Sequence, residues 1–190
     1  MNRGRNRFNK FKKVLYLLAH IVSIFPVPIR MRLFGLIRNI KGIKGLALRY
    51  IVLKSLAKKC GDNVSIHPGV YIFNLNQLII GDNVSIHPMC YIECYGGLSI
   101  GNDVSIAHST TILSTTHNFS ILTKAINNQG VSSCPVFVSD NVWIGCKATI
   151  LGNINIGSGA VIGANSLVNK DVHKNCIVAG VPARKIKERI

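Results

Sequence analysis

The chain repeats one phrase, Ile80-Gly81-Asp82-Asn83-Val84-Ser85-Ile86-His87-Pro88, with copies that begin at Cys60 and Ile100, 20 residues to either side. A large aliphatic residue recurs every six positions, and from Val138 to Val168 this step runs without a gap. Six is neither the period of a helix nor that of a simple alternating strand. It suits short strands joined by tight turns, three to a coil, with the aliphatic side chains inside. We therefore predict a parallel β-solenoid with a continuous aliphatic core.

Each copy of the phrase carries a turn signal between its aliphatic residues, as in Gly81-Asp82-Asn83. We predict tight turns at the glycines and the Asp-Asn pairs, where a positive φ or a side-chain-to-backbone turn is needed. The early coils span 20 residues instead of the 18 that three hexads require. We therefore predict two extra residues at one corner of these coils.

The composition fits a folded domain, because 48% of the 190 residues are apolar and 16% are charged. The net charge of +16 lies at one end of the chain. Residues 1–59 contain 15 Lys and Arg and no acidic residue, whereas residues 60–190 contain 8 basic and 7 acidic residues. A nearly neutral body does not fit a uniformly basic nucleic-acid-binding domain, so we do not expect nucleic acid as a partner.

We interpret residues 1–59 as a basic helical N-terminal arm of two or three short helices. The predicted breaks are Pro26, Pro28, Gly42 and Gly45. The apolar run Val14–Phe25 follows a positive stretch, as in a signal peptide, but no small-residue cleavage site follows it and it is too short to span a bilayer. Two interpretations stay open: the arm attaches to an anionic membrane surface, or it packs on the body or on a sister subunit.

The six cysteines form no C-x-x-C pair, and the six histidines form no His-x-x-His pair. Because these are common patterns of zinc ligands, we expect no metal site. A chain of this size with a full core does not depend on disulfides, so we expect reduced thiols and a cytoplasmic protein. If the arm binds lipid, the protein is peripheral on the inner face of the cytoplasmic membrane.

The repeat resembles that of the hexapeptide-repeat acyltransferases, and the motifs after it are similar to the C-terminal half of the galactoside and maltose O-acetyltransferase group. The motifs are Asn141-Val142-Trp143-Ile144-Gly145, Gly163-Ala164-Asn165-Ser166-Leu167-Val168-Asn169-Lys170 and Ala179-Gly180-Val181-Pro182-Ala183-Arg184. This resemblance implies a mainly β fold, a left-handed parallel β-helix over residues 60–190. We expect the helical arm before it and a short C-terminal helix at its end.

The six-residue frame breaks once, after Thr115-Thr116-His117, and resumes at Val136. We interpret residues 118–135 as an extruded loop, and long excursions from a rigid scaffold often carry function. In the resembling enzymes a histidine at this place is the catalytic base, which assigns that role to His117. An imidazole can take the proton of a hydroxyl as the hydroxyl attacks a thioester.

The resemblance also implies acetyl-coenzyme A as co-substrate and no tightly bound cofactor. The positions that would meet this co-substrate are His87, Cys146, Ala164, Asn169, Lys170, Arg184 and Lys187. The acceptor-binding aspartate of the group falls on Tyr95, with Glu93 two residues before it. Glu93 and Tyr95 are therefore the candidate acceptor residues, and the departure at Tyr95 leaves the identity of the acceptor open.

Together these features predict an O-acetyltransferase that uses acetyl-coenzyme A and acts on a sugar or glycolipid hydroxyl in polysaccharide or lipopolysaccharide biosynthesis. The resembling enzymes are trimers that bind the donor between neighbouring chains, so we expect a homotrimer. A serine acetyltransferase and a nucleotide-amino-sugar N-acetyltransferase are the alternatives. A non-enzymatic β-solenoid scaffold is a further interpretation, against which His117 at the loop argues.

Overall fold

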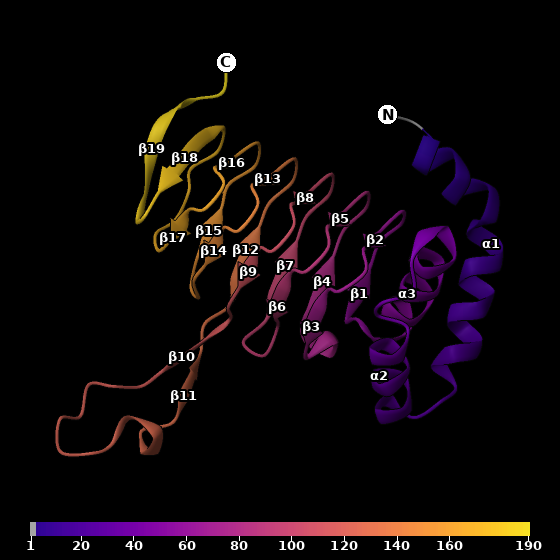
Figure 1. Ribbon diagram of the computed structural model, residues 1–190, viewed down its shortest axis with the longest axis horizontal. Coiled ribbons are helices and arrows are strands. Elements are labelled where there is room, and N and C mark those ends of the chain that lie inside the picture. The colour runs from indigo at the N-terminus through magenta and orange to yellow at the C-terminus, as the bar shows by residue number, and fades with distance from the viewer. Residues whose placement is uncertain (1–2) are drawn as a thin grey trace.

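The computed structural model describes residues 3–190, and it consists of three helices followed by a parallel β-solenoid (Figure 1). The helices are α1 (Arg3–Ser23), α2 (Val27–Leu36) and α3 (Gly42–Leu56). Two single 3-10 turns, η1 (Leu75–Gln77) and η2 (Ile126–Asn128), lie in connections. The prediction of a mainly β chain built as a solenoid is confirmed.

The strands of successive coils stack into three sheets. Sheet A contains β1 (Lys59–Cys60), β4 (Leu78–Ile80), β7 (Leu98–Ile100), β12 (Val136–Val138) and β15 (Asn155–Ile156). Sheet B contains β2 (Ser65–Ile66), β5 (Ser85–Ile86), β8 (Ser105–Ile106), β13 (Trp143–Ile144), β16 (Val161–Ile162), β18 (Cys176–Gly180) and β19 (Ala183–Glu188). Sheet C contains β3 (Tyr71–Phe73), β6 (Tyr91–Glu93), β9 (Thr111–Ile112), β14 (Thr149–Ile150) and β17 (Leu167–Val168).

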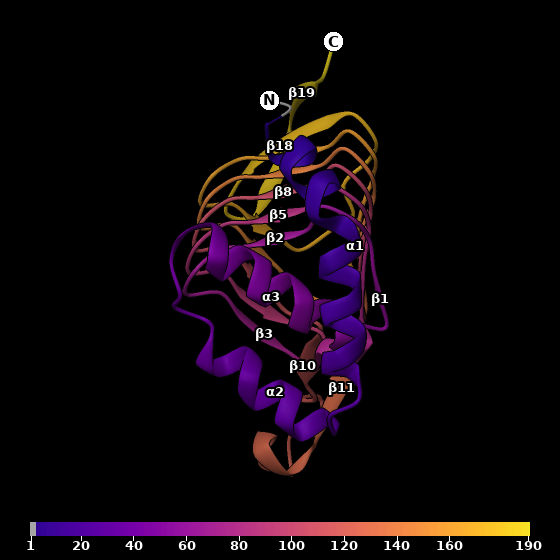
Figure 2. The same cartoon turned by 90° about the vertical axis from the view of Figure 1, so that its right-hand side faces the viewer.

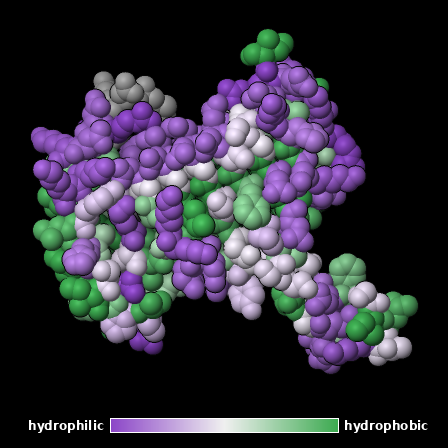
Figure 3. All heavy atoms as spheres, turned by 180° about the vertical axis from the view of Figure 1, so that it is seen from behind, coloured by the Kyte–Doolittle hydropathy of each residue, from purple (hydrophilic) through white to green (hydrophobic). Residues whose placement is uncertain are grey.

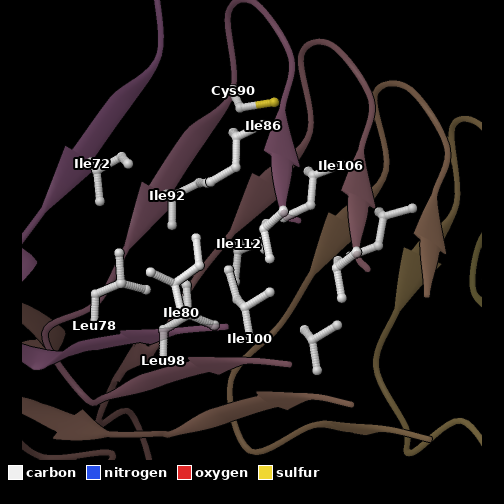
Figure 4. Close-up of a cluster of buried hydrophobic side chains, with 14 of the residues drawn as sticks. Ile72, Leu78, Ile80, Ile86, Cys90, Ile92, Leu98, Ile100, Ile106 and Ile112 are labelled. Atoms are coloured by element: carbon white, nitrogen blue, oxygen red, sulfur yellow. The ribbon is translucent and has the colours of Figure 1, made fainter. Parts of the chain in front are cut away.

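The aliphatic rows of the repeat fill the interior of the coils (Figure 4). In sheet B, Ile66, Ile86 and Ile106 occupy the same register position in successive coils, and each has no exposed surface. Fully burying one such side chain contributes about 1.5–3 kcal/mol relative to leaving it exposed. The repeat therefore supplies both the register and the core, as predicted.

Each coil turns at three corners, which we name A–B, B–C and C–A after the sheets that they join. At the A–B corner the turn residue has a positive φ in four successive coils: Asn63 (52°), Asn83 (57°), Asp103 (56°) and Asn141 (58°). The glycines beside them do not have a positive φ. A Cβ on Gly101 would instead lie 2.3 Å from Asp140 Oδ1 of the next coil. For Gly61, Gly81 and Gly101 the expected reason was therefore wrong, because these glycines are needed for close approach between coils. Gly159, at the A–B corner of the fifth coil, does have a positive φ (73°), as expected.

The C–A corner holds the extra residues of the early coils. The step from Ile72 to Ile80 and from Ile92 to Ile100 is eight positions, whereas the step from Ile66 to Ile72 is six. In the third coil the chain leaves the solenoid at this same corner as a hairpin, β10 (Thr115–His117) and β11 (Val131–Ser133). Figure 1 shows the hairpin projecting away from the stack of coils. The predicted extra residues and the predicted excursion thus share one corner.

The three helices cover the first coil, and in Figure 2 they lie nearest to the viewer. Arg49 of α3 is fully buried, and desolvation by burial lowers its pKa. Its guanidinium donates to four backbone oxygens: Ile66 (2.7 Å), Ile37 (3.0 Å), Arg38 (3.1 Å) and Ile40 (2.8 Å). Arg49 therefore ties the end of α2 to the first coil.

Helix α1 packs along the A–B corner of its own chain. Lys12 Nζ lies 2.5 Å from Asp62 Oδ2, and the Tyr16 hydroxyl donates to the same carboxylate. Desolvation by burial and this hydrogen bond raise the pKa of Tyr16 to about 12. Arg5 reaches the later coils, with Nη2 3.3 Å from Asp103 Oδ1 and Nε 3.1 Å from Asn83 Oδ1.

Two expectations about the helices were wrong. Helix α1 is 21 residues long and not short, because one of its faces packs on the body over its length. Gly45 does not separate helices but lies inside α3. A Cβ there would lie 1.9 Å from the oxygen of Ile40, so glycine permits the preceding segment to cross close to the helix.

The predicted C-terminal helix is also wrong, because the chain ends in a strand. β19 pairs antiparallel with β18, and Gly180 faces Ala183 across the connecting turn. The last strand of a sheet has unpaired backbone groups along its edge. β19 satisfies those of β18, which a helix could not do.

No helix between residues 3 and 190 has the length and apolarity that crossing a membrane requires. Within the same residues no group of three or more His, Cys, Asp or Glu side chains could hold a metal ion. The six cysteines are free thiols, and four of them are buried.

Candidate active site

The hairpin at the C–A corner places His117 outside the solenoid. His117 ends β10 and pairs with Val131 of β11, and its side chain is exposed. The hairpin closes just beyond it, where Asn118 N donates to the oxygen of Gly130 at 3.0 Å. Because no coil covers this part of the chain, the imidazole of His117 is accessible to ligands.

A carboxylate of the preceding coil lies at the same corner. Thr115 Oγ1 donates to Glu93 Oε1 at 2.8 Å, and Glu93 is half-buried at the end of β6. Residues two apart on a strand point to the same side. Thr115 and His117 therefore share one side of β10, and the Glu93 carboxylate lies on that side.

The base of the hairpin is fixed to the solenoid by buried polar groups. Ser114 is fully buried, and its Oγ accepts from Gly96 N at 3.0 Å while its oxygen accepts from Cys134 N at 2.8 Å. A Cβ on Gly96 would lie 2.0 Å from the Ser114 oxygen, so this contact requires glycine. These bonds give the neck of the hairpin one position relative to Glu93.

Three of the predicted donor-binding residues lie at the B–C corner. Cys146 and Ala164 occupy equivalent positions in adjacent coils, where Asn165 N donates to the Cys146 oxygen at 2.9 Å. His87 belongs to the same corner and lies two coils nearer to the helices than Cys146. Its ring stacks on that of His67, with centroids 4.9 Å apart and an interplanar angle of 7°.

The surroundings of His67 disfavour its charged form. Desolvation by burial lowers its pKa, and the neighbouring His87 and Arg49 act in the same direction. The stacked pair thus places the His67 ring, whose pKa is lowered, beside the half-buried ring of His87. His67 follows β2 directly, at the B–C corner of the first coil.

The remaining candidates gather towards the C-terminal end of the solenoid. Lys170 and Arg184 line one pocket of about 180 Å³, together with Asp171 and His173. Asn169 is exposed directly after β17, on the side of sheet C that leads to the C–A corner. Lys187 is exposed on β19 and does not line this pocket.

The structure thus divides the predicted site residues between two edges of sheet C. Glu93 and His117 lie at the C–A corner, and Tyr95 follows Glu93 there with 58% of its surface exposed. Cys146 and Ala164 lie at the B–C corner, across the width of the sheet. Within one chain these two groups do not meet.

Sequence reasoning missed Thr115 and Asn118. Thr115 binds Glu93, and Asn118 braces the hairpin through Nδ2 to the Gln129 oxygen (3.2 Å) and through Oδ1, which accepts from Ser132 Oγ (2.7 Å). The available signal was the run of polar residues on both sides of His117, where the hexad frame stops.

Residues 135–170 match the family model described as bacterial transferase hexapeptide (six repeats). Over 140 residues the chain is 33% identical to the galactoside O-acetyltransferase of Escherichia coli strain K12, and the match covers 74% of this chain and 68% of that protein. The chain belongs to the hexapeptide-repeat acetyltransferases. The resemblance drawn from its motifs is therefore confirmed, and the protein is an enzyme of this family.

Solved structures of the family have the same fold. A maltose O-acetyltransferase from Clostridium difficile 630 superimposes with a TM-score of 0.74 at 25% identity, covering 88% of each chain. A variant of AntD, an N-acyltransferase from Bacillus cereus, superimposes with a TM-score of 0.58 at 25% identity over 72% of this chain and 87% of its own. The AntD structure contains dTDP-4-amino-4,6-dideoxyglucose and coenzyme A. These hexapeptide-repeat enzymes include both O- and N-acyltransferases.

Proposed function

We propose that this acetyltransferase transfers the acetyl group of acetyl-coenzyme A to a hydroxyl of a sugar, with His117 as general base. The observation that supports this most is the exposed imidazole of His117 at the neck of the hairpin, on the side of β10 that holds the Glu93 carboxylate. The similarity to galactoside and maltose O-acetyltransferases favours a sugar hydroxyl as acceptor.

The proposed reaction needs one base and no covalent intermediate. A ring nitrogen of His117 takes the proton of the sugar hydroxyl as its oxygen attacks the thioester carbonyl carbon. The tetrahedral intermediate carries a negative oxygen, which backbone N–H groups can stabilise. It collapses as the carbon–sulfur bond breaks, and the thiolate of coenzyme A leaves and takes up the proton. Binding both substrates side by side supplies a large part of the rate.

We propose a homotrimer in which the His117 corner of one chain faces the B–C corner of the next. The division of the candidate residues between two edges of sheet C supports this, because a neighbouring chain could supply the half that each corner lacks. Co-expressing His117→Ala chains with Ala164→Trp chains tests it. Each variant alone is expected to be inactive, whereas random mixing restores about a quarter of the sites in a closed ring. Mixed assemblies without activity would contradict shared sites.

The test of the reaction is an acceptor panel with acetyl-coenzyme A, in which release of free thiol and the acetylated product are both measured. The panel contains sugars with free hydroxyls, nucleotide-linked amino sugars and serine. Ester formation on a sugar supports the proposal. An amide as the only product would instead favour the N-acyltransferase alternative, for which the likeness to AntD is the supporting observation. Acetylation of serine alone would refute both.

We further propose that the acceptor belongs to a polysaccharide or lipopolysaccharide under assembly. This proposal is tested by comparing acetyl transfer to a free monosaccharide with acetyl transfer to a lipid-linked oligosaccharide that ends in the same sugar. A lower KM for the lipid-linked acceptor supports this assignment, and equal or better turnover of the free sugar contradicts it.

A further inference from the structure

Helix α1 carries a second apolar face that the body of the protein does not cover. Its inner face packs on the core through Phe8, Leu15, Ala19 and Val22. The outer face, continued by Ile24 and Phe25 just after the end of α1, exposes Phe11 (53%), Val14 (54%), Leu17 (59%), Leu18 (40%), Ile21 (45%), Ile24 (75%) and Phe25 (51%). These residues are spaced three and four apart, so they form one continuous stripe. We call them the outer stripe of α1.

The apolar surface continues onto α2 at the bend between the two helices. Val27 and Ile29 are 48% and 50% exposed, and Leu36 is 81% exposed. A groove of about 320 Å³ joins the helices and is lined by Val22, Phe25, Ile29, Arg30, Arg32, Leu33 and Leu36. Figure 3 shows hydrophobic side chains gathered over this helical end of the molecule. A contiguous exposed patch of this kind marks an interaction surface.

The charges around the stripe specify the kind of partner. Residues 1–59 contain no acidic side chain. Among the described residues, Arg5 and Lys12 are the only cations of the arm within 4.0 Å of a carboxylate. Arg7, Lys10 and Lys13 are exposed at the N-terminal part of α1. The surface therefore offers apolar side chains and uncompensated cations side by side.

We propose that the outer stripe of α1, with the adjoining α2 residues, docks on the surface of an anionic lipid bilayer. The apolar residues would enter the boundary between headgroups and acyl chains while the cations meet lipid phosphates. Nucleic acid would match the cations but leave seven apolar side chains in water. Phe11 and Val14 of the stripe also line the pocket that α1 forms with α3 and the first two coils. The helices lie at the first-coil end of the solenoid (Figure 2), so docking through them does not cover the later coils that carry Cys146 and Ala164.

Vesicle sedimentation of the full chain tests the proposal. The protein is expected to bind vesicles that contain phosphatidylglycerol more tightly than vesicles of phosphatidylcholine alone. Leu17→Glu/Ile24→Glu places two charges in the stripe and should weaken binding at least about tenfold. Ile186→Glu is the matched control, because Ile186 is 62% exposed at the opposite end of the solenoid and should bind like the wild type. Raising the salt to about 1 M should weaken binding without abolishing it.

A fluorescence measurement keeps the proposal testable if the glutamate variant fails to fold, because it detects binding as an increase in signal. In a Trp143→Phe background, Leu17→Trp provides one indole on the stripe. Its emission should shift to the blue with anionic vesicles and be quenched by brominated lipid, whereas Ile186→Trp in the same background should not respond. Failure of the wild type to bind anionic vesicles would overturn the proposal. So would duplex DNA binding without vesicle binding, or a Leu17→Glu/Ile24→Glu variant that loses oligomeric mass but keeps vesicle binding.

Discussion

The A–B and C–A corners of the solenoid differ although both turn the same chain. At the A–B corner successive coils repeat one arrangement, with a left-handed Asn or Asp and side-chain amides and carboxylates bonded from coil to coil. At the C–A corner η1 in the first coil gives way to the β10–β11 hairpin in the third. Where coils stack without interruption, polar side chains such as Asn102 and Asp140 bond to the neighbouring coil. Where stacking is interrupted, side chains such as His117 are left for other chemistry.

Removing the imidazole at the C–A corner is expected to have the largest effect. His117→Ala should lower kcat by about 10²–10⁴-fold, which corresponds to about 3–5 kcal/mol of transition-state stabilisation. Because His117 is exposed, the free energy of unfolding should change by less than about 0.5 kcal/mol. Steady-state acetyl transfer and urea unfolding measure the two. His20→Ala removes an exposed histidine of α1 and serves as the control. Wild-type turnover in His117→Ala would contradict a catalytic role for the C–A corner.

A substitution at the regular A–B corner should lower the stability of the fold. Gly101→Ala brings a Cβ to 2.3 Å from Asp140 Oδ1 and 2.8 Å from the Ser139 carbonyl carbon. Because backbone must move, we expect a loss of about 2–3 kcal/mol in the free energy of unfolding. Gly130→Ala in the hairpin, where the nearest atom lies 3.9 Å away and φ is +83°, should cost only about 1 kcal/mol. Equal costs at the two sites would show that the regular corner is not tightly packed.

The Glu93 carboxylate at the C–A corner, which accepts from Thr115, is expected to act on the acceptor. Glu93→Gln should lower kcat/KM for the acceptor by about tenfold, since a charged hydrogen-bond partner becomes neutral. The KM for acetyl-coenzyme A should stay unchanged. Thr115→Ser keeps the hydroxyl that donates to Glu93 and should behave like the wild type. An effect of Glu93→Gln on the acetyl-coenzyme A KM alone would move Glu93 to the donor site.

The smallest effect is expected where α1 binds the first A–B corner. Desolvation raises the pKa of Asp62, but the hydrogen bonds from Lys12 and Tyr16 outweigh it, so the pKa lies below its ordinary value. A lowered folded pKa gives stability that is present above the unfolded pKa and is lost as the pH falls through the folded value. Near neutral pH the free energy of unfolding of the wild type should therefore exceed that of Asp62→Asn by less than about 1 kcal/mol. This difference should shrink below about pH 4, and a difference independent of pH would exclude the ionic contribution.

The regular parts of the molecule could be predicted because each coil repeats the same physical demand. The six-residue step placed Ile66, Ile86 and Ile106 in one buried row, and the break after His117 marked the hairpin. The glycines of the repeated phrase, Gly61, Gly81 and Gly101, were located correctly but explained wrongly, because the distance between coils is not visible in a single sequence. Gly101 is needed for that distance and not for its φ.

The irregular parts depend on contacts that have no local signal. Helix α1 is apolar on two faces, so its pattern could not tell which face packs. The final strand β19 forms because β18 has an open edge, a feature of the assembled sheet. The division of Glu93 and Cys146 between two corners likewise depends on where each coil turns, which counting along the sequence did not give.

The most direct test of the central claim is a crystal structure of the enzyme with bound coenzyme A. If chemistry occurs at the C–A corner, the coenzyme sulfur should lie within about 4 Å of a His117 imidazole, from the same or a neighbouring chain. The pantetheine arm should then follow a B–C corner past Ala164. A sulfur far from every His117 would contradict the account, for example in the apolar pocket that Phe8 and Leu46 line between α1 and α3.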